Sequence, residues 1–251
     1  MMDIGAKTLF GPQIEIMDST LRDGEQTSGV SFLPHEKLII ARSLLHDVNV
    51  DRIEVASARV SEGEREAVTR ICNYAQREGY IDRIEVLGFV DGKLSIDWIK
   101  GCGCRVINLL VKGSLKHCQH QLHKAPEEHL ADILHSLDYA EQQGLRVNIY
   151  LEDWSSGMKD SPEYVYQMMD RLKDTPIQRF MLPDTLGIMN PLQCVEYVRK
   201  MHRRYPDKRF DFHAHNDYDL AVSNTLAAVL SGCQGVHVTV NGLGERCGNA
   251  P

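Results

Sequence analysis

The chain has 251 residues, with 28 lysines and arginines against 35 aspartates and glutamates, and a formal net charge of −7. A hydrophobic content of 43% and a charged content of 25% are those of an ordinary globular protein, and exclude a disordered chain, a collagen-like repeat and a coiled coil. The acidic balance argues against a nucleic acid partner, because phosphate backbones attract clustered lysine and arginine. The densest basic stretch, Lys200–Arg209, is interrupted by Tyr205-Pro206-Asp207 and is interpreted as a solvated helix end.

Neither a membrane segment nor a secretion signal is predicted. No apolar run approaches the ~18 residues that cross a bilayer, and Met1–Gly11 lacks the apolar core of a signal peptide. The seven cysteines are an odd number in a chain large enough to bury its own core, so we expect a cytoplasmic protein with reduced thiols. Cys102 and Cys104 lack a second pair at zinc-site spacing and are not predicted to bind metal.

Short β-branched or apolar runs recur at intervals of roughly 32 residues, the length of a strand, a helix and two loops. This spacing predicts parallel strands, because each pair of parallel strands needs a crossover between them. The predicted strands are Ile14–Leu21, Arg52–Ser57, Arg83–Val90, Val106–Lys112, Arg146–Leu151, Arg179–Pro183, Phe210–His215 and Val236–Asn241.

The segments between these runs carry signals for helices. Ser61 with Glu64 forms a potential capping box. Ser161-Pro162 and Asn190-Pro191 each place a capping residue before a proline in the first helical position. Glu127–Gln143 and Tyr218–Ser231 also show helical periodicity.

Eight strand–helix units predict an α/β fold, a (β/α)8 TIM barrel. A doubly wound sheet is less favoured, since no G-x-G-x-x-G follows the first strand. The last predicted strand ends close to Pro251, so we expect the eighth helix and any C-terminal domain to be missing from this chain. The expected organisation is a lead-in over residues 1–13 and a catalytic barrel, truncated after strand eight, over residues 14–251.

Ionisable residues gather at the carboxyl ends of five predicted strands, where the active sites of such barrels lie. A purely structural barrel has no reason to collect them there. The segments are Asp18–Gln26, Glu152–Asp153, Asp184–Thr185, His213–Asp217 and Asn241–Arg246.

The pair His213 and His215 is the strongest sign of a metal site. Two residues apart on a strand, they point to one face with Cα atoms about 6.6 Å apart. Both imidazoles can then reach one metal at about 2.1 Å. With Asp23 as an oxygen ligand from across the barrel, coordination positions stay open, as in a catalytic divalent cation site. A competing cluster, less favoured because it follows strand four on a polar stretch, is His117, Cys118, His120 and His123.

Three of these segments resemble the signatures of the 2-isopropylmalate, homocitrate and citramalate synthase family, which are metal-dependent Claisen-condensing barrels. They are Asp18–Gln26 (DSTLRDGEQ), His213–Asp217 (HAHND) and Asn241–Arg246 (NGLGER), and the resemblance extends from Ile14 to Pro251. Asn148–Ser155 (NIYLEDWS) and Ile84–Gly92 (IEVLGFVDG) look most like the citramalate synthase branch. The resemblance implies an acyltransferase that condenses acetyl-CoA, its co-substrate, with a 2-oxo acid.

Within that family the substrate is expected to be pyruvate, giving (R)-citramalate for isoleucine biosynthesis, and the protein is expected to be a homodimer with small-molecule partners. The resemblance makes Asp23, His213 and His215 ligands of a divalent metal (Mn, Mg or Zn), with Asn241 as a weaker or outer ligand. The family places a catalytic histidine after the barrel, so no general base is named in this chain.

The resemblance also implies roles for residues that contact the substrates. Arg22 would stabilise the alkoxide, Thr185 would donate its hydroxyl to the substrate carboxylate, and Glu152 would orient or activate the acetyl group. Bulky residues at three positions match those that crowd the side-chain pocket of citramalate synthases and exclude the isopropyl group of 2-oxoisovalerate. These residues, which could equally fill the barrel interior, are Leu87, Leu110 and Tyr150.

Four alternatives stay open. The first is a 2-isopropylmalate synthase of leucine biosynthesis, which uses 2-oxoisovalerate. The second is a C–C lyase of the hydroxymethylglutaryl-CoA lyase type. The third treats Gly242–Gly248 as the phosphate cradle of a sugar-phosphate isomerase or aldolase. The fourth is a ligand-binding barrel without activity.

Overall fold

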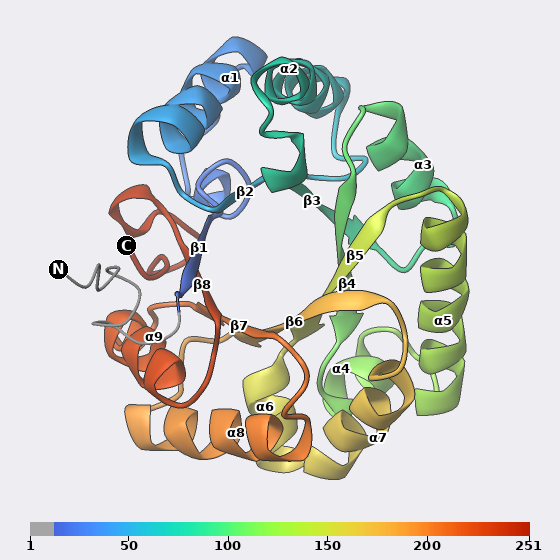
Figure 1. Cartoon of the computed structure of the whole chain (residues 1–251). Coiled ribbons are helices and arrows are strands. Elements are labelled where there is room, and N and C mark those ends of the chain that lie inside the picture. The colour runs from blue at the N-terminus through green and yellow to red at the C-terminus, as the bar shows by residue number, and fades with distance from the viewer. Residues whose placement is uncertain (1–12) are drawn as a thin grey trace, which may run out of the picture.

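The structure is a computed structural model that describes residues 13–251, so the predicted lead-in lies outside the described residues except for Gln13. Eight parallel strands follow one another around a closed barrel, and β8 pairs with β1 (Figure 1). The predicted TIM-barrel fold is therefore confirmed. The strands are β1 (Glu15–Asp18), β2 (Arg52–Ser57), β3 (Ile84–Phe89), β4 (Val106–Lys112), β5 (Arg146–Glu152), β6 (Ile177–Asp184), β7 (Phe210–Ala214) and β8 (Gly235–Val238).

Helices form the outer ring (Figure 1). They are α1 (Pro34–Arg42), α2 (Glu62–Glu78), α3 (Leu94–Gly101), α4 (Leu115–His120), α5 (Pro126–Gln142), α6 (Trp154–Asp160), α7 (Pro162–Leu172), α8 (Pro191–Arg204) and α9 (Ala221–Leu230). A π-helical segment, η3 (Ser43–Val48), continues α1, and shorter turns are η2 (Gly24–Gln26), η4 (Ile81–Arg83) and η5 (Val240–Gly242). No helix in residues 13–251 combines the length and the apolar character that a membrane crossing requires.

Two of the predicted helix starts differ in how they are capped. Asn190 forms a full capping box with Gln193, each side chain accepting the other's backbone N–H at 3.0 Å. The Ser61 hydroxyl accepts the Glu64 N–H at 3.1 Å, but the Glu64 carboxylate does not reach back. It pairs instead with the buried ammonium of Lys37 at 2.6 Å, because that charge has no access to water.

Three of the strands that carry the candidate site, β1, β7 and β8, end earlier than predicted, whereas β5 and β6 each extend one residue further, to Glu152 and Asp184. The Thr20 N–H donates to the Asp18 carboxylate at 2.8 Å, which ends β1. β7 ends at Ala214, and His215 forms an isolated antiparallel bridge with Asn249. β8 ends at Val238, so Asn241 lies in η5, with φ of 55°.

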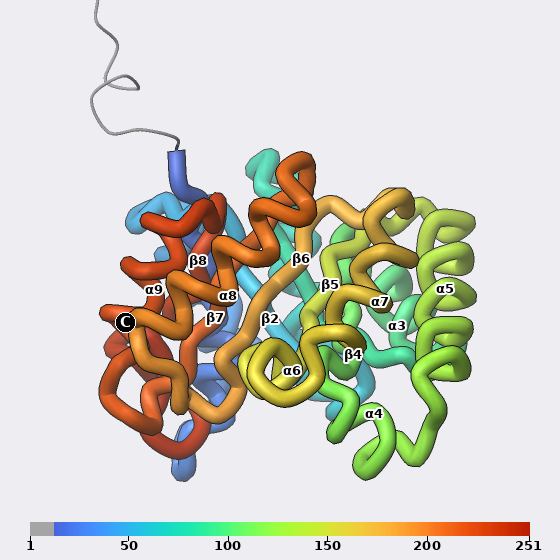
Figure 2. The backbone as a smooth tube through the Cα atoms, turned by 90° about the horizontal axis from the view of Figure 1, so that it is seen from below, coloured from blue at the N-terminus to red at the C-terminus, as the bar shows by residue number. Residues whose placement is uncertain are grey.

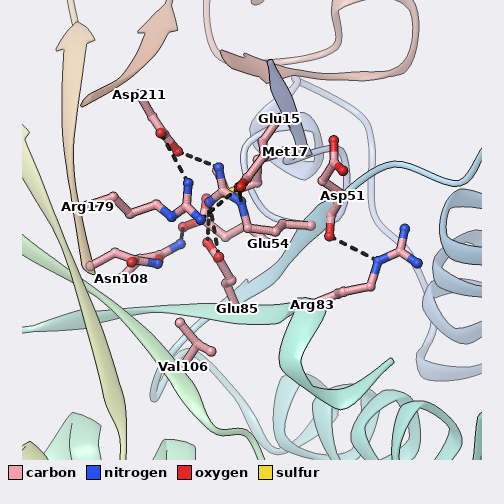
Figure 3. Close-up of polar contacts among 12 residues, drawn as sticks. Glu15, Met17, Asp51, Glu54, Arg83, Glu85, Val106, Asn108, Arg179 and Asp211 are labelled. Carbon is pink, nitrogen blue, oxygen red and sulfur yellow. Dashed lines mark hydrogen bonds and ion pairs between the residues drawn. The ribbon is translucent and has the colours of Figure 1, made fainter. Parts of the chain in front are cut away.

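The molecule buries two different regions. Between the strands and the helices lies an aliphatic shell, which includes Ile53, Ile71 and Leu109. Inside the barrel, the layer toward the amino-terminal ends of the strands is charged. This charged layer consists of Glu15, Arg52, Glu85, Arg179 and Asp211 (Figure 3).

Above the charged layer, two residues further along several strands, lies a small apolar cluster. This pocket floor consists of Met17, Leu87, Tyr150 and Met181, with Leu110 packed against it. In the charged layer, Arg52 contacts Glu85 at 3.1 Å and also Asp211. Burial by itself would raise the pKa of the Asp211 carboxyl, but the neighbouring Arg52 holds that pKa below its usual range.

Candidate active site

A pocket of about 210 Å³ opens at the carboxyl ends of the strands. Helices α4 and α6, which follow β4 and β5, lie toward this same end of the barrel (Figure 2). All but one of the site residues predicted from the sequence line the pocket, the exception being Asn241. The lining residues are Arg22, Asp23, Gln26, Ser57, Leu87, Phe89, Leu110, Tyr150, Glu152, Pro183, Thr185, His213, His215 and Glu245.

Three acceptor atoms converge in this pocket. His213 Nε2 lies 3.1 Å and His215 Nε2 lies 3.9 Å from Asp23 Oδ2, and the two imidazole nitrogens are 3.3 Å apart. Within residues 13–251, one group of three or more histidine, cysteine or acidic side chains is close enough together to hold a metal ion. That group is Asp23, His213 and His215. The Asp23 side chain is fully buried, and neither of its oxygens has a hydrogen-bond partner.

The charges favour a cation among these three atoms. Burial, together with neighbouring His213, lowers the pKa of His215 to about 3, so the imidazole is neutral and its lone pair is free. Burial would raise the pKa of Asp23, but Arg22 holds it below its usual range, so the carboxylate is ionised. Buried acceptors facing one another without donors are unfavourable, and a divalent cation satisfies them. The residues therefore fit a metal.

Arg22 is held beside this cluster by the buried carboxylate of Glu54, which was not predicted from the sequence. Its Nε donates to Glu54 at 2.6 Å, while its Nη1 lies 3.5 Å from Asp23 Oδ1. Glu54 also accepts from Ser19 at 2.9 Å and from Asn108 at 2.8 Å. The guanidinium is thus fixed in orientation and faces the pocket. The one signal for Glu54 in the sequence is a charge between the apolar residues Ile53 and Val55.

Two further site residues are positioned by neighbours at the ends of β4 and β5. The Glu152 carboxylate forms an ion pair with Lys112. The Thr185 hydroxyl accepts the Asp153 N–H at 2.8 Å, which leaves its own proton free to donate into the pocket. Asp153 holds φ of 62°, and its carboxylate accepts from Ser114 at 2.7 Å. The sequence indicated Asp153 only as an ionisable residue at a strand end, and it gave no role to Lys112.

Two asparagines after β8, the predicted Asn241 and also Asn249, differ in their surroundings. Asn241 is exposed in η5 and lies outside the pocket lining. Asn249 is buried, bridges His215 through its backbone, and leaves its Oδ1 without a hydrogen-bond partner. Its side chain donates through Nδ2 to Leu243 O at 3.0 Å. The asparagine whose backbone pairs with that of His215 is therefore Asn249.

The alternative sites find little support in the geometry. In the histidine-rich segment after β4, the His117 ring faces Asp153 at 3.5 Å. The glycine-rich loop uses its N–H groups within the protein, since Gly242, Leu243, Gly244 and Gly248 all donate to protein oxygens. Such a loop has few amides left to cradle a phosphate.

Comparison with known proteins agrees with the fold. The profile of the family described as HMGL-like matches residues 13–251. The (R)-citramalate synthase of Methanocaldococcus jannaschii is 36% identical over 94% of this chain and 46% of that protein. The 2-isopropylmalate synthase of the same organism is also 36% identical, over 95% of this chain and 44% of that protein. The chain thus spans about half the length of these relatives.

Among solved structures, the hydroxymethylglutaryl-CoA lyase of Pseudomonas aeruginosa superimposes with a TM-score of 0.80. It covers 95% of this chain and 82% of that chain at 20% identity, so the likeness concerns the fold alone. The match of the family profile to every described residue, together with the relatives above, shows that the chain belongs to the HMGL-like family.

Proposed function

We propose that the protein is a metal-dependent acyltransferase that condenses acetyl-CoA with a 2-oxo acid. The observation that carries this proposal is the convergence of Asp23, His213 and His215 beside Arg22 and Thr185, at the mouth of a small, partly apolar pocket. Metal ligands, a fixed guanidinium and a hydroxyl donor are the groups that a chelated 2-oxo acid needs.

Asp23 and the Nε2 atoms of His213 and His215 would hold a divalent cation, Mn, Mg or Zn. We assign the fourth ligand to the amide oxygen of Asn249 in place of Asn241, since Asn249 is buried beside His215. The bound cation would act as a Lewis acid and as a template for the carboxylate and keto oxygens of the substrate. Neutral imidazoles and an ionised carboxylate are the protonation states that this role requires.

Arg22 then stabilises the charge that develops on the keto oxygen as the new C–C bond closes. Glu54 fixes its guanidinium before the substrate arrives, so little reorganisation is needed in the transition state. Thr185 donates its free proton to the substrate carboxylate, because Asp153 already occupies one of its lone pairs. Glu152 orients the acetyl group of acetyl-CoA, and Lys112 keeps this carboxylate at the ends of β4 and β5.

For the 2-oxo acid we propose pyruvate, which gives (R)-citramalate in isoleucine biosynthesis. Leu87, Leu110 and Tyr150 line the pocket, and they leave room for a methyl group more readily than for an isopropyl group. Two extra methyl groups must displace packed atoms, at a cost of about 1–3 kcal/mol. The runner-up is a 2-isopropylmalate synthase of leucine biosynthesis, because relatives with both names are equally similar to this chain.

Release of free CoA tests the proposal. Acetyl-CoA and Mn²⁺ are supplied with pyruvate, 2-oxobutyrate or 2-oxoisovalerate, and the thiol is followed with a chromogenic disulfide. Thiol release that depends on the 2-oxo acid, fastest with pyruvate, is expected, and Asp23→Asn should abolish it. A higher kcat/KM with 2-oxoisovalerate would favour the isopropylmalate reaction. Cleavage of 3-hydroxy-3-methylglutaryl-CoA without any condensation would favour the lyase.

Two properties of the whole protein are also proposed, a homodimer and a cytoplasmic location. All seven cysteines are free, and six of them are buried, which suits a reducing compartment. Light scattering on the purified protein should give twice the mass of one chain. A monomer at micromolar concentration would contradict the dimer.

A further inference from the structure

His237 is a buried histidine with no role in the reaction described above. It lies on β8, where it is in register with His213 on β7 and Met17 on β1, and its side chain points into the barrel. Only 1% of its surface is exposed. The imidazole therefore lies between the pocket floor and the charged layer.

The two nitrogens of His237 have different neighbours. Nδ1 lies 2.8 Å from the Tyr150 hydroxyl, and Nε2 lies 3.5 Å from Asp211 Oδ2. A carboxylate can only accept, so the proton of the neutral ring belongs on Nε2. Nδ1 is then an acceptor, and the Tyr150 hydroxyl donates to it.

Asp211 is itself fixed from several sides. Arg52 pairs with it, and Arg179 Nη1 lies 3.4 Å from its Oδ1 (Figure 3). Its carboxylate also lies against the backbone of β8, since a Cβ atom at Gly235 would be 2.4 Å from Asp211 Oδ1. A continuous set of contacts thus runs from the charged layer through His237 to Tyr150.

Tyr150 is the polar member of the pocket floor. It packs with Met17, Leu87 and Met181, and 3% of its surface is exposed. A buried hydroxyl without a partner is unfavourable, and the partner found for this one is His237. The height of the phenol ring in the barrel, and with it the depth of the side-chain pocket, therefore depends on this hydrogen bond.

We propose that His237 is a specificity-determining positioning residue, which holds Tyr150 against the charged layer and so limits the size of the 2-oxo acid side chain. This inference rests on the proposed function, because it concerns the pocket for that substrate. When the hydrogen bond is lost, Tyr150 gains freedom to move. A larger side chain then enters more easily, while pyruvate loses part of its packing.

Two variants of the same residue separate positioning from simple filling of space. The amide of asparagine occupies the place of Nδ1, so His237→Asn keeps an acceptor for Tyr150. The amide of glutamine reaches the place of Nε2, so His237→Gln keeps the contact with Asp211 but leaves the Tyr150 hydroxyl alone. Tyr150→Phe removes that hydroxyl and nothing else, and serves as the third variant.

The readouts are the kcat/KM ratio of pyruvate to 2-oxobutyrate and the ratio of their dissociation constants in the presence of Mn²⁺. His237→Gln and Tyr150→Phe should each lower both ratios by ~3- to 10-fold, the effect of one lost hydrogen bond. His237→Asn should stay within ~2-fold of the wild type. The double variant His237→Gln/Tyr150→Phe should show no further change, since both substitutions remove one interaction.

Equal losses for both substrates, with unchanged ratios, would show a merely structural role and overturn the proposal. A wild-type protein that uses no 2-oxo acid would instead contradict the proposed function. In that case imidazole ¹⁵N shifts still test the contact, because Tyr150→Phe should move the Nδ1 resonance of His237 and leave that of His129 in place. An unmoved His237 resonance would overturn the positioning role by itself.

Discussion

The aliphatic shell and the interior of the barrel are both buried, yet they are built from opposite kinds of residue. The shell packs β-branched and aliphatic side chains such as Ile53 and Ile71 against the helices. The interior contains a charged layer, the imidazole of His237 and a small pocket floor, which lie beneath Asp23, His213 and His215. The shell stabilises the fold through packing, whereas the interior fixes the orientation of the groups that line the pocket.

This difference matters because TIM barrels usually fill their interior with branched apolar residues. Here two arginines and three carboxylates occupy one layer of it. Such a layer is sensitive to the loss of any one member, since a remaining charge then stays buried without a partner. Substitutions in the charged layer should therefore cost more than substitutions of similar size in the shell.

The largest effect is expected from Arg52→Met, which leaves Glu85 and Asp211 short of a cation. The free energy of unfolding should fall by about 3–5 kcal/mol. As the matched control in the shell, Ile71→Val should lower it by about 0.5–1.5 kcal/mol. Urea unfolding of both variants, followed by circular dichroism, provides the comparison. If the two substitutions lower the free energy of unfolding by the same amount, the charges of this layer do not depend on their partners for stability.

The sequence predicted the shell better than the interior for a physical reason. Periods of two and of about 3.6 residues identify strands and helices locally, so β2 and β4 were predicted with their observed bounds. The contacts of the interior depend on the register of all eight strands at once. A carboxylate such as Glu54 or Asp211 is therefore visible in the sequence only as a charge within an apolar run.

The residues of the candidate active site were likewise predicted where the signal was local and missed where it depended on the fold. The motif containing Asp23 and the histidine pair indicated a common metal, because strand ends of a barrel meet at one face. The prediction of Asn241 did not anticipate how the loop after β8 folds back, which buries Asn249 and pairs its backbone with that of His215. The bridge between His215 and Asn249 is formed by that loop and has no local signal in the sequence.

The next effect concerns Arg22→Lys, at the upper end of the interior. A lysine offers one point charge, which cannot pair with Glu54 and face the pocket at the same time. The kcat should fall by ~100-fold while KM changes by less than ~5-fold, because the charge on the keto oxygen develops only in the transition state. Steady-state kinetics with pyruvate decide this. A rise in KM with unchanged kcat would assign Arg22 to ground-state binding.

A smaller effect is expected from His129, a buried histidine of the shell whose Nε2 accepts the Lys112 N–H at 3.0 Å. Burial lowers its pKa from 6.5 to about 4. Below about pH 6.5 the unfolded chain binds a proton that the folded chain does not. The free energy of unfolding therefore decreases as the pH is lowered from about 6.5 to about 4. His129→Gln keeps an acceptor for Lys112 but does not titrate.

The wild type should therefore lose about 2 kcal/mol more than His129→Gln between pH 7 and pH 5. Urea unfolding at the two pH values measures that difference. His135→Ala, an exposed change on the same helix, serves as the control and should follow the wild type. Equal losses in the wild type and in His129→Gln would show that the His129 pKa is not lowered in the folded state.

The most direct test of the account is the number of Mn²⁺ ions that one chain binds, counted by electron paramagnetic resonance of the free ion during a titration. We expect one ion per chain for the wild type and for His135→Ala, and none for His213→Ala at the same concentrations, with all three proteins folded. An unchanged ion count in His213→Ala, or a wild type that binds no ion, would contradict the claim that Asp23, His213 and His215 form a single metal centre.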